Sequence, residues 1–524
     1  MKKTKATMLL LLSVMLTATA CGGGGGEEAG GGTSAPSGEE AASGNDAASG
    51  GAPAEEQGNG EIVDLTVAFP VVTSDQQGLQ LVEEAMNKIT EAKIGARVDF
   101  MPINAGEWLQ QTNLLFSSNG KLDLTYVHGG MYSNMVARGM LAPLDDLIGQ
   151  YGGGITSAMD AKYLQATKIG GKTYSVPSNR DMAGSYGLVM RKDLADKYGI
   201  DPSSLRTLED VAAALQKIKD GEPNVVPLVP GAAGQSFRDS YLFFDPLGDN
   251  MGVLPNYDNG LKVANLFELP EYQSFVRTIR DWYTKGYILK DAATNKISTF
   301  ELMRSGKAFS YLAMQKPGFA AQESKASGTE LVTAELLPPY TTTSNVTAAM
   351  WGVPVHSELK EKAMQFLNLM YEDPEIVNLF SWGVEGTHYV KAEGAAEHVI
   401  AYPEGKDASS VGYNSLAWMF GDQFKAYVLA TNDPDIWTKT AEFNRTATPS
   451  KALGFLFDSS AVKTEYAAVS NVITQYKLPL ETGSVDPDKM LPEFVEKLKA
   501  AGIDKIIAEK QKQLDEWASV NAAK

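Results

Sequence analysis

The sequence predicts an α/β protein whose folded body has at least two lobes. The chain has 524 residues, about three times the usual size of one domain. Hydrophobic residues make up 44% of it and charged residues 21%, the balance of a globular protein with ample material for a core. From about residue 61 onward, strand and helix patterns alternate, which is typical of a parallel sheet with helices on its faces.

The first twenty residues have the features of a secretory signal peptide. Three lysines near the start precede a short apolar run, residues 8–16, and small residues follow at 17–20. Such a run is too short to span the bilayer core of about 30 Å, which needs roughly 20 residues. We therefore expect residues 1–20 to direct export.

Cys21, the only cysteine, follows this signal directly. Its position resembles the lipobox of bacterial lipoproteins, in which the cysteine is lipidated and becomes the first residue, although Ala18 stands where the lipobox usually has leucine. The alternative is a free cysteine beside an ordinary cleavage site. The resemblance implies lipidation of Cys21 and a lipid-anchored protein on the extracellular face of the cytoplasmic membrane.

Residues 22–60 predict a flexible tether, so that 21–60 form a lipid-anchored linker. The stretch is rich in glycine, alanine, serine and glutamate, and it has no aromatic residue, valine, isoleucine, leucine, lysine or arginine. Such a composition buries too little apolar surface to offset the entropy of ordering the chain. As a random coil it reaches about 35 Å.

The body begins with the alternating pattern. A strand over 61–72 precedes an amphipathic helix with apolar residues at Leu79, Val82, Met86 and Ile89, and two more strands and a helix follow. Ligands of parallel sheets bind at the carboxyl ends of strands, here the loops 70–77 and 128–134. The later expected elements are a hairpin at 170–177, strands at 186–190, 308–314 and 348–355, helices at 192–198, 272–283 and 358–370, one helix starting near Thr207, and two closing helices around 491–498 and 503–517.

The composition and the motifs argue against several classes of function. The formal net charge of −18 disfavours nucleic acid as the main ligand, because phosphate binding needs clustered cations. One cysteine excludes intramolecular disulfides, cysteine-rich zinc sites and iron–sulfur clusters. The sequence also lacks Gly-x-Ser-x-Gly, His-Glu-x-x-His and EF-hand motifs. We expect no catalysis, metal or cofactor, although carboxylate pairs for glycoside hydrolysis stay possible.

Several stretches together resemble the extracellular solute-binding proteins of ABC importers. The resemblance is to carbohydrate-binding family 1, which is maltose-binding-protein-like, and within it to the large LipO-type lipoproteins of Firmicutes. It covers essentially all of 61–524. The residues that carry it are Leu122–Val127, Ala137–Leu141, Gly170–Pro177, Leu188–Leu194, Thr207–Asp210, Ser305–Ala308, Trp382–Tyr389 and the region from Gly454 to Trp517.

This resemblance implies a two-lobed periplasmic-binding-protein-like fold with a ligand cleft between the lobes. Three crossings would join the lobes, near 181–190, near 345–353 and between about 400 and 420. Lobe one would comprise 61–185 plus about 351–410. Lobe two would comprise about 186–350 plus 411–524, including a C-terminal helical module.

The implied function is capture of an oligosaccharide by hinged closure of the cleft and delivery to the permease subunits of an ABC importer, by a monomeric receptor. Two alternatives stay open: a receptor for a non-sugar solute such as a peptide, and an anchored glycoside hydrolase.

Sugar sites of this kind combine aromatic faces, which cover the C–H face of a pyranose, with charged and amide groups that bind hydroxyls. The expected platforms are Trp351, Trp382 and Trp418, each with core packing as the alternative. Trp282 and Trp517 are expected in the core, and Trp437 is undecided. The other expected ligand contacts are His128, Tyr132, Arg180, Asp181, Tyr186, Gln315, Glu385 and His388.

Overall fold

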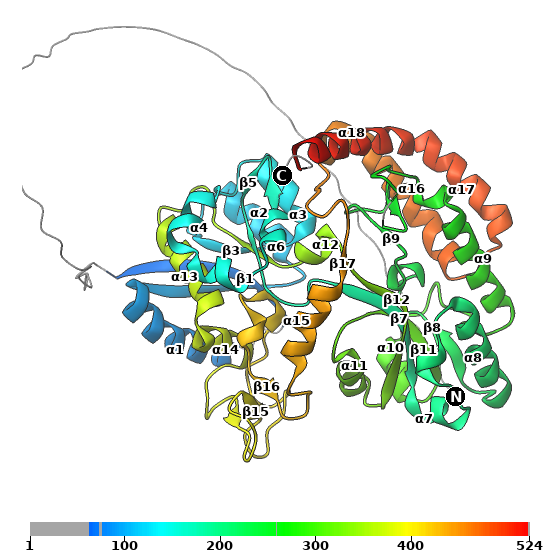
Figure 1. Ribbon diagram of the computed structural model, residues 1–524, viewed down its shortest axis with the longest axis horizontal. Helices are drawn as coiled ribbons and strands as arrows, with labels where there is room; N and C mark the ends of the chain where they lie inside the picture. The colour runs from blue at the N-terminus through cyan, green and yellow to red at the C-terminus, as the bar shows by residue number, and fades with distance from the viewer. Residues whose placement is uncertain (1–61, 73–75, 258, 522–524) are drawn as a thin grey trace, which may run out of the picture. The chain divides into compact units, whose positions relative to one another are not determined.

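The computed structural model describes residues 62–72, 76–257 and 259–521, and its body is built on two five-stranded sheets (Figure 1). The expected signal peptide, Cys21 and the linker lie outside the described residues. Among the helices of the described part, none has the length and apolar character needed to span a bilayer.

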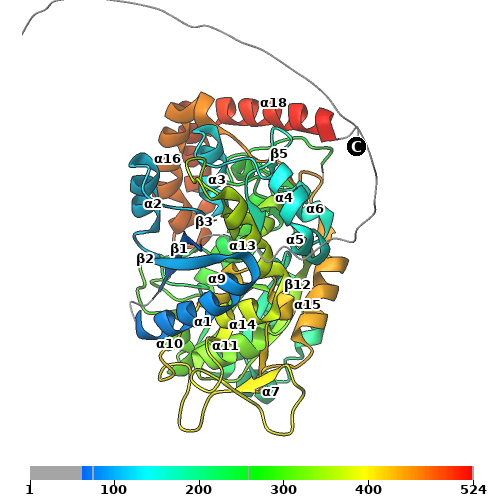
Figure 2. The ribbon, with the colours of Figure 1, turned by 90° about the vertical axis from the view of Figure 1, so that its left-hand side faces the viewer.

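The first sheet has the strand order β2-β1-β3-β13-β6. Strand β1 (Val63–Val71) pairs in parallel with β2 (Ala96–Asn104) and with β3 (Leu124–Val127), which confirms the predicted alternation. The connecting helices α1 (Gln76–Ile94) and α2 (Trp108–Ser117) lie on opposite sides of β1 and β2 in Figure 2. Because helices cover both faces of the sheet, all consecutive residues in the middle of β1 are buried, rather than every second one.

Two later strands complete this sheet. They are β13 (Met350–Gly352), antiparallel to β3, and β6 (Val176–Pro177), antiparallel to β13. We call the part of the chain built on this sheet lobe one.

The second sheet, which defines lobe two, has the order β17-β12-β7-β11-β8. Its strands are β7 (Gly184–Arg191), β8 (Val226–Val229), β11 (Ala308–Gln315), β12 (Leu331–Thr341) and β17 (Thr448–Pro449). Strand β7 runs antiparallel to both neighbours, whereas β8 and β11 are parallel.

Two helices of lobe two have clear local causes in the sequence, a capping box in one and an apolar face in the other. Thr207 caps α8 (Leu208–Gly221) in a capping box with Asp210, in which each side chain satisfies a backbone N–H that the helix leaves free. Helix α9 (Pro270–Thr284) buries Phe275, Ile279 and Trp282 along one face, so the predicted core position of Trp282 is confirmed.

The remaining elements are shorter or C-terminal. The other helices are α3 (Gly129–Ala137), α4 (Asp145–Tyr151), α5 (Gly153–Ala158), α6 (Ala161–Gln165), α7 (Lys192–Lys197), α10 (Thr299–Arg304), α11 (Phe319–Ser327), α12 (Thr343–Val346), α13 (Lys360–Glu372), α14 (Pro374–Trp382), α15 (Ile436–Thr446), α16 (Lys463–Glu481), α17 (Pro487–Ala501) and α18 (Ile503–Asn521). The other strands are β4 (Lys168–Ile169), β5 (Lys172–Thr173), β9 (Phe244–Asp245), β10 (Leu254–Pro255), β14 (Val390–Lys391), β15 (Val399–Ala401) and β16 (Val428–Leu429).

Six short 3₁₀ helices complete the described secondary structure: η1 (Pro202–Ser204), η2 (Arg238–Ser240), η3 (Leu266–Glu268), η4 (Ala417–Met419), η5 (Gln423–Lys425) and η6 (Ser459–Val462). Strands β4 and β5 form a hairpin over residues 168–173, so the hairpin predicted at 170–177 begins and ends earlier than expected.

Each lobe has its own hydrophobic core. The core of lobe one gathers residues that lie far apart in the sequence, among them Phe69, Phe380 and Phe420, with the last two rings stacked 4.2 Å apart. The core of lobe two continues into the C-terminal helices, since Phe494 of α17 packs edge-on against Phe267. Helices α16 to α18 therefore complete lobe two rather than form a separate domain.

Three segments connect the sheets. The first crossing lies between β6 and β7 (178–183) and the second between β12 and β13 (342–349), overlapping the predicted positions. The third lies between α15 and β17, after residue 446, so its prediction between about 400 and 420 is wrong. Residues 411–446 belong with lobe one, because Met419 and Phe420 are buried in its core.

The crossings are bonded to one another. The side chain of Asn444 accepts a hydrogen bond from the Met182 N–H at 2.8 Å and donates one to the Arg180 carbonyl at 2.6 Å. The Ser178 N–H donates to the Ala349 carbonyl at 3.0 Å, which joins the first crossing to the second. The Asn444 and Ser178 hydrogen bonds thus hold the connecting segments together, as in the hinge of a two-lobed protein.

Candidate functional site

Two pockets lie where residues of both lobes meet. The first, which we call the tryptophan pocket, has a volume of about 440 Å³. Lobe one contributes Trp382, Trp418 and Trp437 to its wall, and lobe two contributes the loop after β11 and helix α11. The second, the α3 pocket, has a volume of about 400 Å³ and is lined by the start of α3, the second crossing, a loop of lobe two and the segment 455–466.

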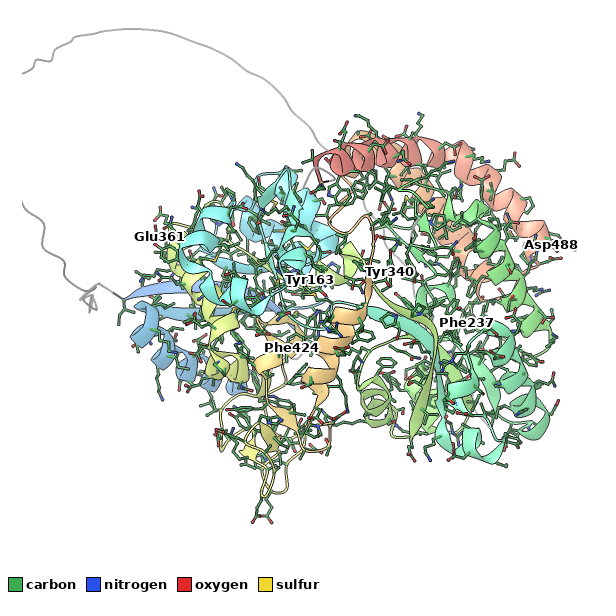
Figure 3. All side chains as sticks on the ribbon, in the orientation of Figure 1. Tyr163, Phe237, Tyr340, Glu361, Phe424 and Asp488 are labelled. Atoms are coloured by element: carbon green, nitrogen blue, oxygen red, sulfur yellow. The ribbon has the colours of Figure 1, made fainter. Side chains whose placement is uncertain are left out.

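The indole rings of the tryptophan pocket are held in fixed orientations. The Trp382 indole N–H donates to the Tyr427 carbonyl at 2.9 Å, and that of Trp437 donates to the Ala426 carbonyl at 2.7 Å. The ring of Phe424, labelled in Figure 3, packs edge-on against Trp437 at 6.0 Å. Because the polar edges of Trp382 and Trp437 already have partners, these rings can offer the pocket apolar surface.

A charged cluster joins the lobes beside these rings. Asp181 of the first crossing accepts from Arg180 at 2.7 Å, and its other oxygen lies 3.1 Å from the Lys316 ammonium of lobe two. The Arg180 guanidinium also lies over the Trp418 ring, 5.3 Å from its centre. Asp181 is only 8% exposed, so two cations compensate the burial of its carboxylate.

The rest of the lining suits a ligand rich in hydroxyl groups. Hydrogen-bonding side chains surround the indole rings on both lobes, namely Gln322, Lys325, Gln423, Asn432 and Asp433. A sugar ring has an apolar C–H face that an indole can cover and hydroxyls at its edge that amides and charged groups can bind. Apolar walls with a few convergent polar groups are the usual make-up of a small-molecule site.

The α3 pocket is more polar. His128 is the N-cap of α3, and its Nδ1 accepts from the Gly130 N–H at 3.1 Å, while burial lowers the pKa of its imidazole. The second crossing lies directly against this turn, because a Cβ on Gly129 would come within 2.5 Å of the Thr347 hydroxyl. Asp249, Phe457 and Tyr466 line the opposite side from lobe two.

The structure places some of the predicted site residues at these pockets. Asp181, Trp382 and Trp418 line the tryptophan pocket, Arg180 contacts Trp418, and His128 lines the α3 pocket. Their roles in binding stay predictions. Gln315 lies in another cavity, and its amide is bonded to the carbonyls of Leu188 and Ala334 within lobe two.

Two predicted contacts are wrong because the side chains are core residues. Trp351 is fully buried in lobe one, and its indole N–H donates to the Met419 carbonyl at 2.6 Å. Tyr132 is also fully buried, with its hydroxyl donating to the Thr167 carbonyl at 2.6 Å. Burial raises the pKa of the Tyr132 hydroxyl, as expected for a ring inside the core.

Three further candidates line neither of the two pockets. Tyr186 is on β7 in the core of lobe two, where burial raises its pKa. His388 is buried in the loop after α14, where its Nδ1 accepts from the Val384 N–H at 2.9 Å, and Glu385 of the same loop is exposed. His388 is thus bonded within its own loop.

Other pocket residues were missed by the sequence reasoning. The sequence does not decide whether Trp437 lies in the core or at the site, and it points to Gln315 rather than to the next residue, Lys316. Asp249 and Tyr466 belong to no motif, so no signal pointed to them. Among the described residues, no group of three or more His, Cys, Asp or Glu side chains is arranged to hold a metal ion.

Two family models match the chain. The bacterial extracellular solute-binding protein model matches residues 84–386, and a domain of unknown function, DUF3502, matches residues 451–519. A carbohydrate ABC transporter substrate-binding protein of Streptococcus pneumoniae is 30% identical over 439 residues, which cover 82% of this chain and 86% of the relative.

Solved structures of similar architecture include an N-glycan transport solute binding protein, NgtS, from Streptococcus pneumoniae. It is 27% identical, with a TM-score of 0.76 over 87% of this chain and 99% of NgtS. For NgtS in complex with Man5GlcNAc, the TM-score is 0.65 over 87% of this chain and 98% of NgtS.

The burial of Trp351 leads to a prediction about stability. Trp351→Ala should lower the free energy of unfolding by about 3–5 kcal/mol, because it removes a buried ring and leaves a cavity. Trp418→Ala is the matched control and should cost much less, since its ring is half-buried at a pocket. Urea unfolding followed by circular dichroism measures both, and equal losses would contradict this assignment of core and pocket rings.

Proposed function

The chain belongs to the bacterial extracellular solute-binding proteins, and on that premise we propose that it captures an oligosaccharide in the tryptophan pocket and delivers it to an ABC importer. One observation carries the choice of pocket: three indole rings from lobe one converge on a cavity whose remaining wall, with Lys316 and α11, comes from lobe two. A sugar bound there touches both lobes, so it favours the arrangement in which they are close together.

The relatives support the choice of ligand class. One is a carbohydrate ABC transporter substrate-binding protein, and NgtS is an N-glycan transport protein solved with Man1GlcNAc and with Man5GlcNAc. We take these two glycans as the first probes for this chain. A thermal-shift panel should include them with fructo-oligosaccharides and peptides, because a ligand that binds only the folded state raises the melting temperature. A response to peptides alone would favour the non-sugar receptor.

Binding without catalysis is the better account of this pocket. Hydrolysis of a glycosidic bond needs two carboxyl groups about 5–9.5 Å apart, one of them free to donate a proton. The two acidic residues of the tryptophan pocket are both engaged by cations, Asp181 by Arg180 and Lys316, and Asp433 by Lys439. Release of product from a labelled oligosaccharide would instead favour the hydrolase.

The family is extracellular. We further propose that this chain is attached to the cytoplasmic membrane. A lipid on Cys21 would hold the protein at the outer face of the cytoplasmic membrane, with residues 22–60 as the tether and the permease subunits as partners. We propose that the receptor acts as a monomer.

The aromatic site predicts a loss of affinity without a loss of fold. Trp418→Ala removes an apolar ring face on which a sugar could stack. Its loss should weaken binding by about 2–3 kcal/mol, which raises the dissociation constant about 30- to 150-fold. Isothermal titration with the best sugar of the panel measures the change, and the unliganded melting temperature should stay within a few degrees. Trp418→Phe is the control and should keep most of the affinity. Unchanged affinity in Trp418→Ala would place the sugar elsewhere.

The anchor predicts a change of location. Cys21→Ala removes the thiol to which the lipid would be attached, so the protein should appear in the medium when it is expressed in its native type of cell. Cys21→Ser is a closely isosteric second variant and should give the same result. Immunoblots of membrane and medium fractions measure the distribution, and retention of both variants in the membrane fraction would contradict lipidation.

A further inference from the structure

One charged side chain of the tryptophan pocket has no counter-ion. The charged residues that line the pocket are Asp181, Lys316, Lys325 and Asp433. Asp181 pairs with Lys316. Asp433 pairs with Lys439, which lies outside the lining. In the part of the chain that the structure describes, no carboxylate forms an ion pair with Lys325, which is exposed. The pocket therefore contains an uncompensated positive charge.

The Lys325 ammonium lies between the lobes. Lys325 is in the last turn of α11, in lobe two, and its ammonium is 5.9 Å from the centre of the Tyr402 ring of lobe one. Tyr402 packs against the same small apolar cluster as Trp382, one of the three indoles of the pocket. The unpaired cation thus lies on the side of the pocket where Trp382 is found.

The acidic side chains nearest to Lys325 along the chain and around Tyr402 have partners of their own. Glu323, two positions earlier on α11, is buried and accepts from the Tyr311 hydroxyl at 2.7 Å. Asp407 acts electrostatically on the Tyr402 hydroxyl, but its carboxylate accepts hydrogen bonds from two serines of its own turn. Neither carboxylate pairs with the Lys325 ammonium.

One face of α11 is shaped to admit a ligand. The residues that line the pocket follow one another every three or four positions, namely Gly318, Ala321, Gln322 and Lys325. Helix α11 faces α15 across the pocket, and the lobes approach closely at Gly318, because a Cβ there would come within 2.7 Å of Ile436 (Figure 1). The small side chains leave room beside the indoles, and the ammonium reaches in from the other end of the helix.

A free ammonium in a closing pocket favours one kind of ligand. If the lobes close around a neutral sugar, Lys325 loses water without gaining an opposite charge, and that desolvation is costly. A ligand carboxylate supplies the missing charge and accepts a charge-assisted hydrogen bond, which is stronger than one between neutral groups. Closure therefore favours an anionic ligand over a neutral one of the same shape.

We propose that the oligosaccharide bound in the tryptophan pocket carries an acidic sugar unit, whose carboxylate pairs with Lys325 while its ring lies against an indole. This inference rests on the proposed function, since it names the substrate class of the same pocket. Lys325 is then the residue that determines specificity for charge. Uronic acids and sialic acids both supply a carboxylate on a sugar ring, and the test separates them.

The net charge of the chain is compatible with an anionic ligand. The formal charge of −18 repels an anion at a distance, but such repulsion is screened beyond about 8 Å at physiological ionic strength. Inside the pocket, the contact with Lys325 decides the preference. The long-range repulsion mainly slows association, whereas the local pair slows dissociation.

The test measures a ratio of affinities on the full chain purified in detergent. Trigalacturonate is compared with its methyl ester, and 3′-sialyllactose with lactose, so each acidic probe has a neutral counterpart. Lys325→Met removes the charge and keeps most of the side-chain length, and Lys325→Arg keeps the charge. Lys307→Met is the matched control, because Lys307 is exposed on the same lobe and does not line the pocket.

The wild type should bind at least one acidic probe about tenfold more tightly than its neutral counterpart, the gain expected for one charge-assisted pair. Lys325→Met should bring this ratio close to one and should melt near the wild type, since the side chain is exposed. Lys325→Arg and Lys307→Met should keep the preference. Isothermal titration measures each affinity, and added salt should reduce the ratio in the wild type.

Two results would overturn the inference while leaving the proposed function intact. One is a wild type that binds Man5GlcNAc but prefers neither acidic probe. The other is a preference that Lys325→Met leaves unchanged, which would mean that Lys325 only stabilises the end of α11. If Trp418→Ala leaves every affinity unchanged, the proposed site fails instead, and if the wild type binds no glycan, both proposals fail.

Discussion

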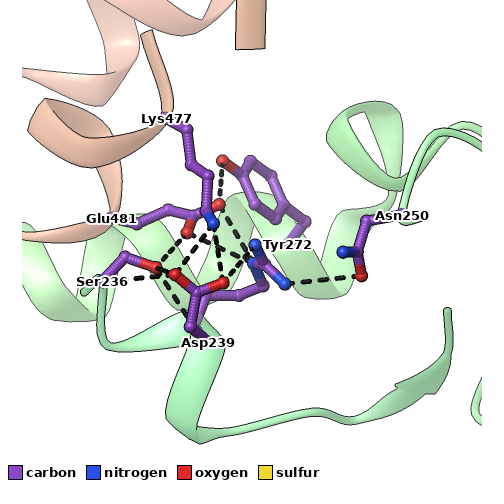
Figure 4. Close-up of polar contacts among 7 residues, drawn as sticks. Ser236, Asp239, Asn250, Tyr272, Lys477 and Glu481 are labelled. Atoms are coloured by element: carbon purple, nitrogen blue, oxygen red, sulfur yellow. Dashed lines mark hydrogen bonds and ion pairs between the residues drawn. The ribbon is translucent and has the colours of Figure 1, made fainter. Parts of the chain in front are cut away.

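The ion pair between Arg238 and Glu481 is the interaction on which the assembly of lobe two depends. Removing two charges from water is costly, and their attraction compensates only when the remaining hydrogen-bonding groups are satisfied. Here Tyr272 donates to Glu481 at 3.1 Å, Arg238 donates to Asp239 at 2.8 Å, and Lys477 donates to Asp239 at 2.7 Å (Figure 4). Loss of one partner would leave an uncompensated buried charge, so the loop after β8 and helix α16 must be present together.

This constraint explains why the C-terminal module, residues 451–519, is part of lobe two. The network joins η2, α9 and α16, and through Asn250 it reaches the loop that Lys510 also binds. The α3 pocket consequently lies between lobe one and a part of lobe two that this network supports. Between them run crossings that are bonded to each other through Asn444 and Ser178, so the simplest motion left to the lobes is rotation about that region.

The sequence predicted the parts of the fold that depend on local pattern. The alternation of strands and helices predicted the parallel order of β1, β2 and β3, and the apolar stripe of α9 predicted the burial of Trp282. Sequence reasoning assigns Trp351 to the ligand because it lies beside a glycine near a predicted crossing. Its burial is decided by Met419 and Phe420, which are close to 70 positions later in the chain and were placed in the wrong lobe.

The pocket residues show the same limit of prediction from local sequence. Asp181, Trp382 and Trp418 were found because they follow recognisable segments, whereas Asp249 and Lys510 are 261 residues apart and only the folded chain brings them together. Closure of the two lobes around one hinge by a sugar can be measured by small-angle X-ray scattering of the full chain with and without saturating Man5GlcNAc. The radius of gyration should be smaller with the glycan in the wild type and unchanged in Trp418→Ala at the same glycan concentration. An unchanged radius in wild-type protein that calorimetry shows to be saturated would contradict it.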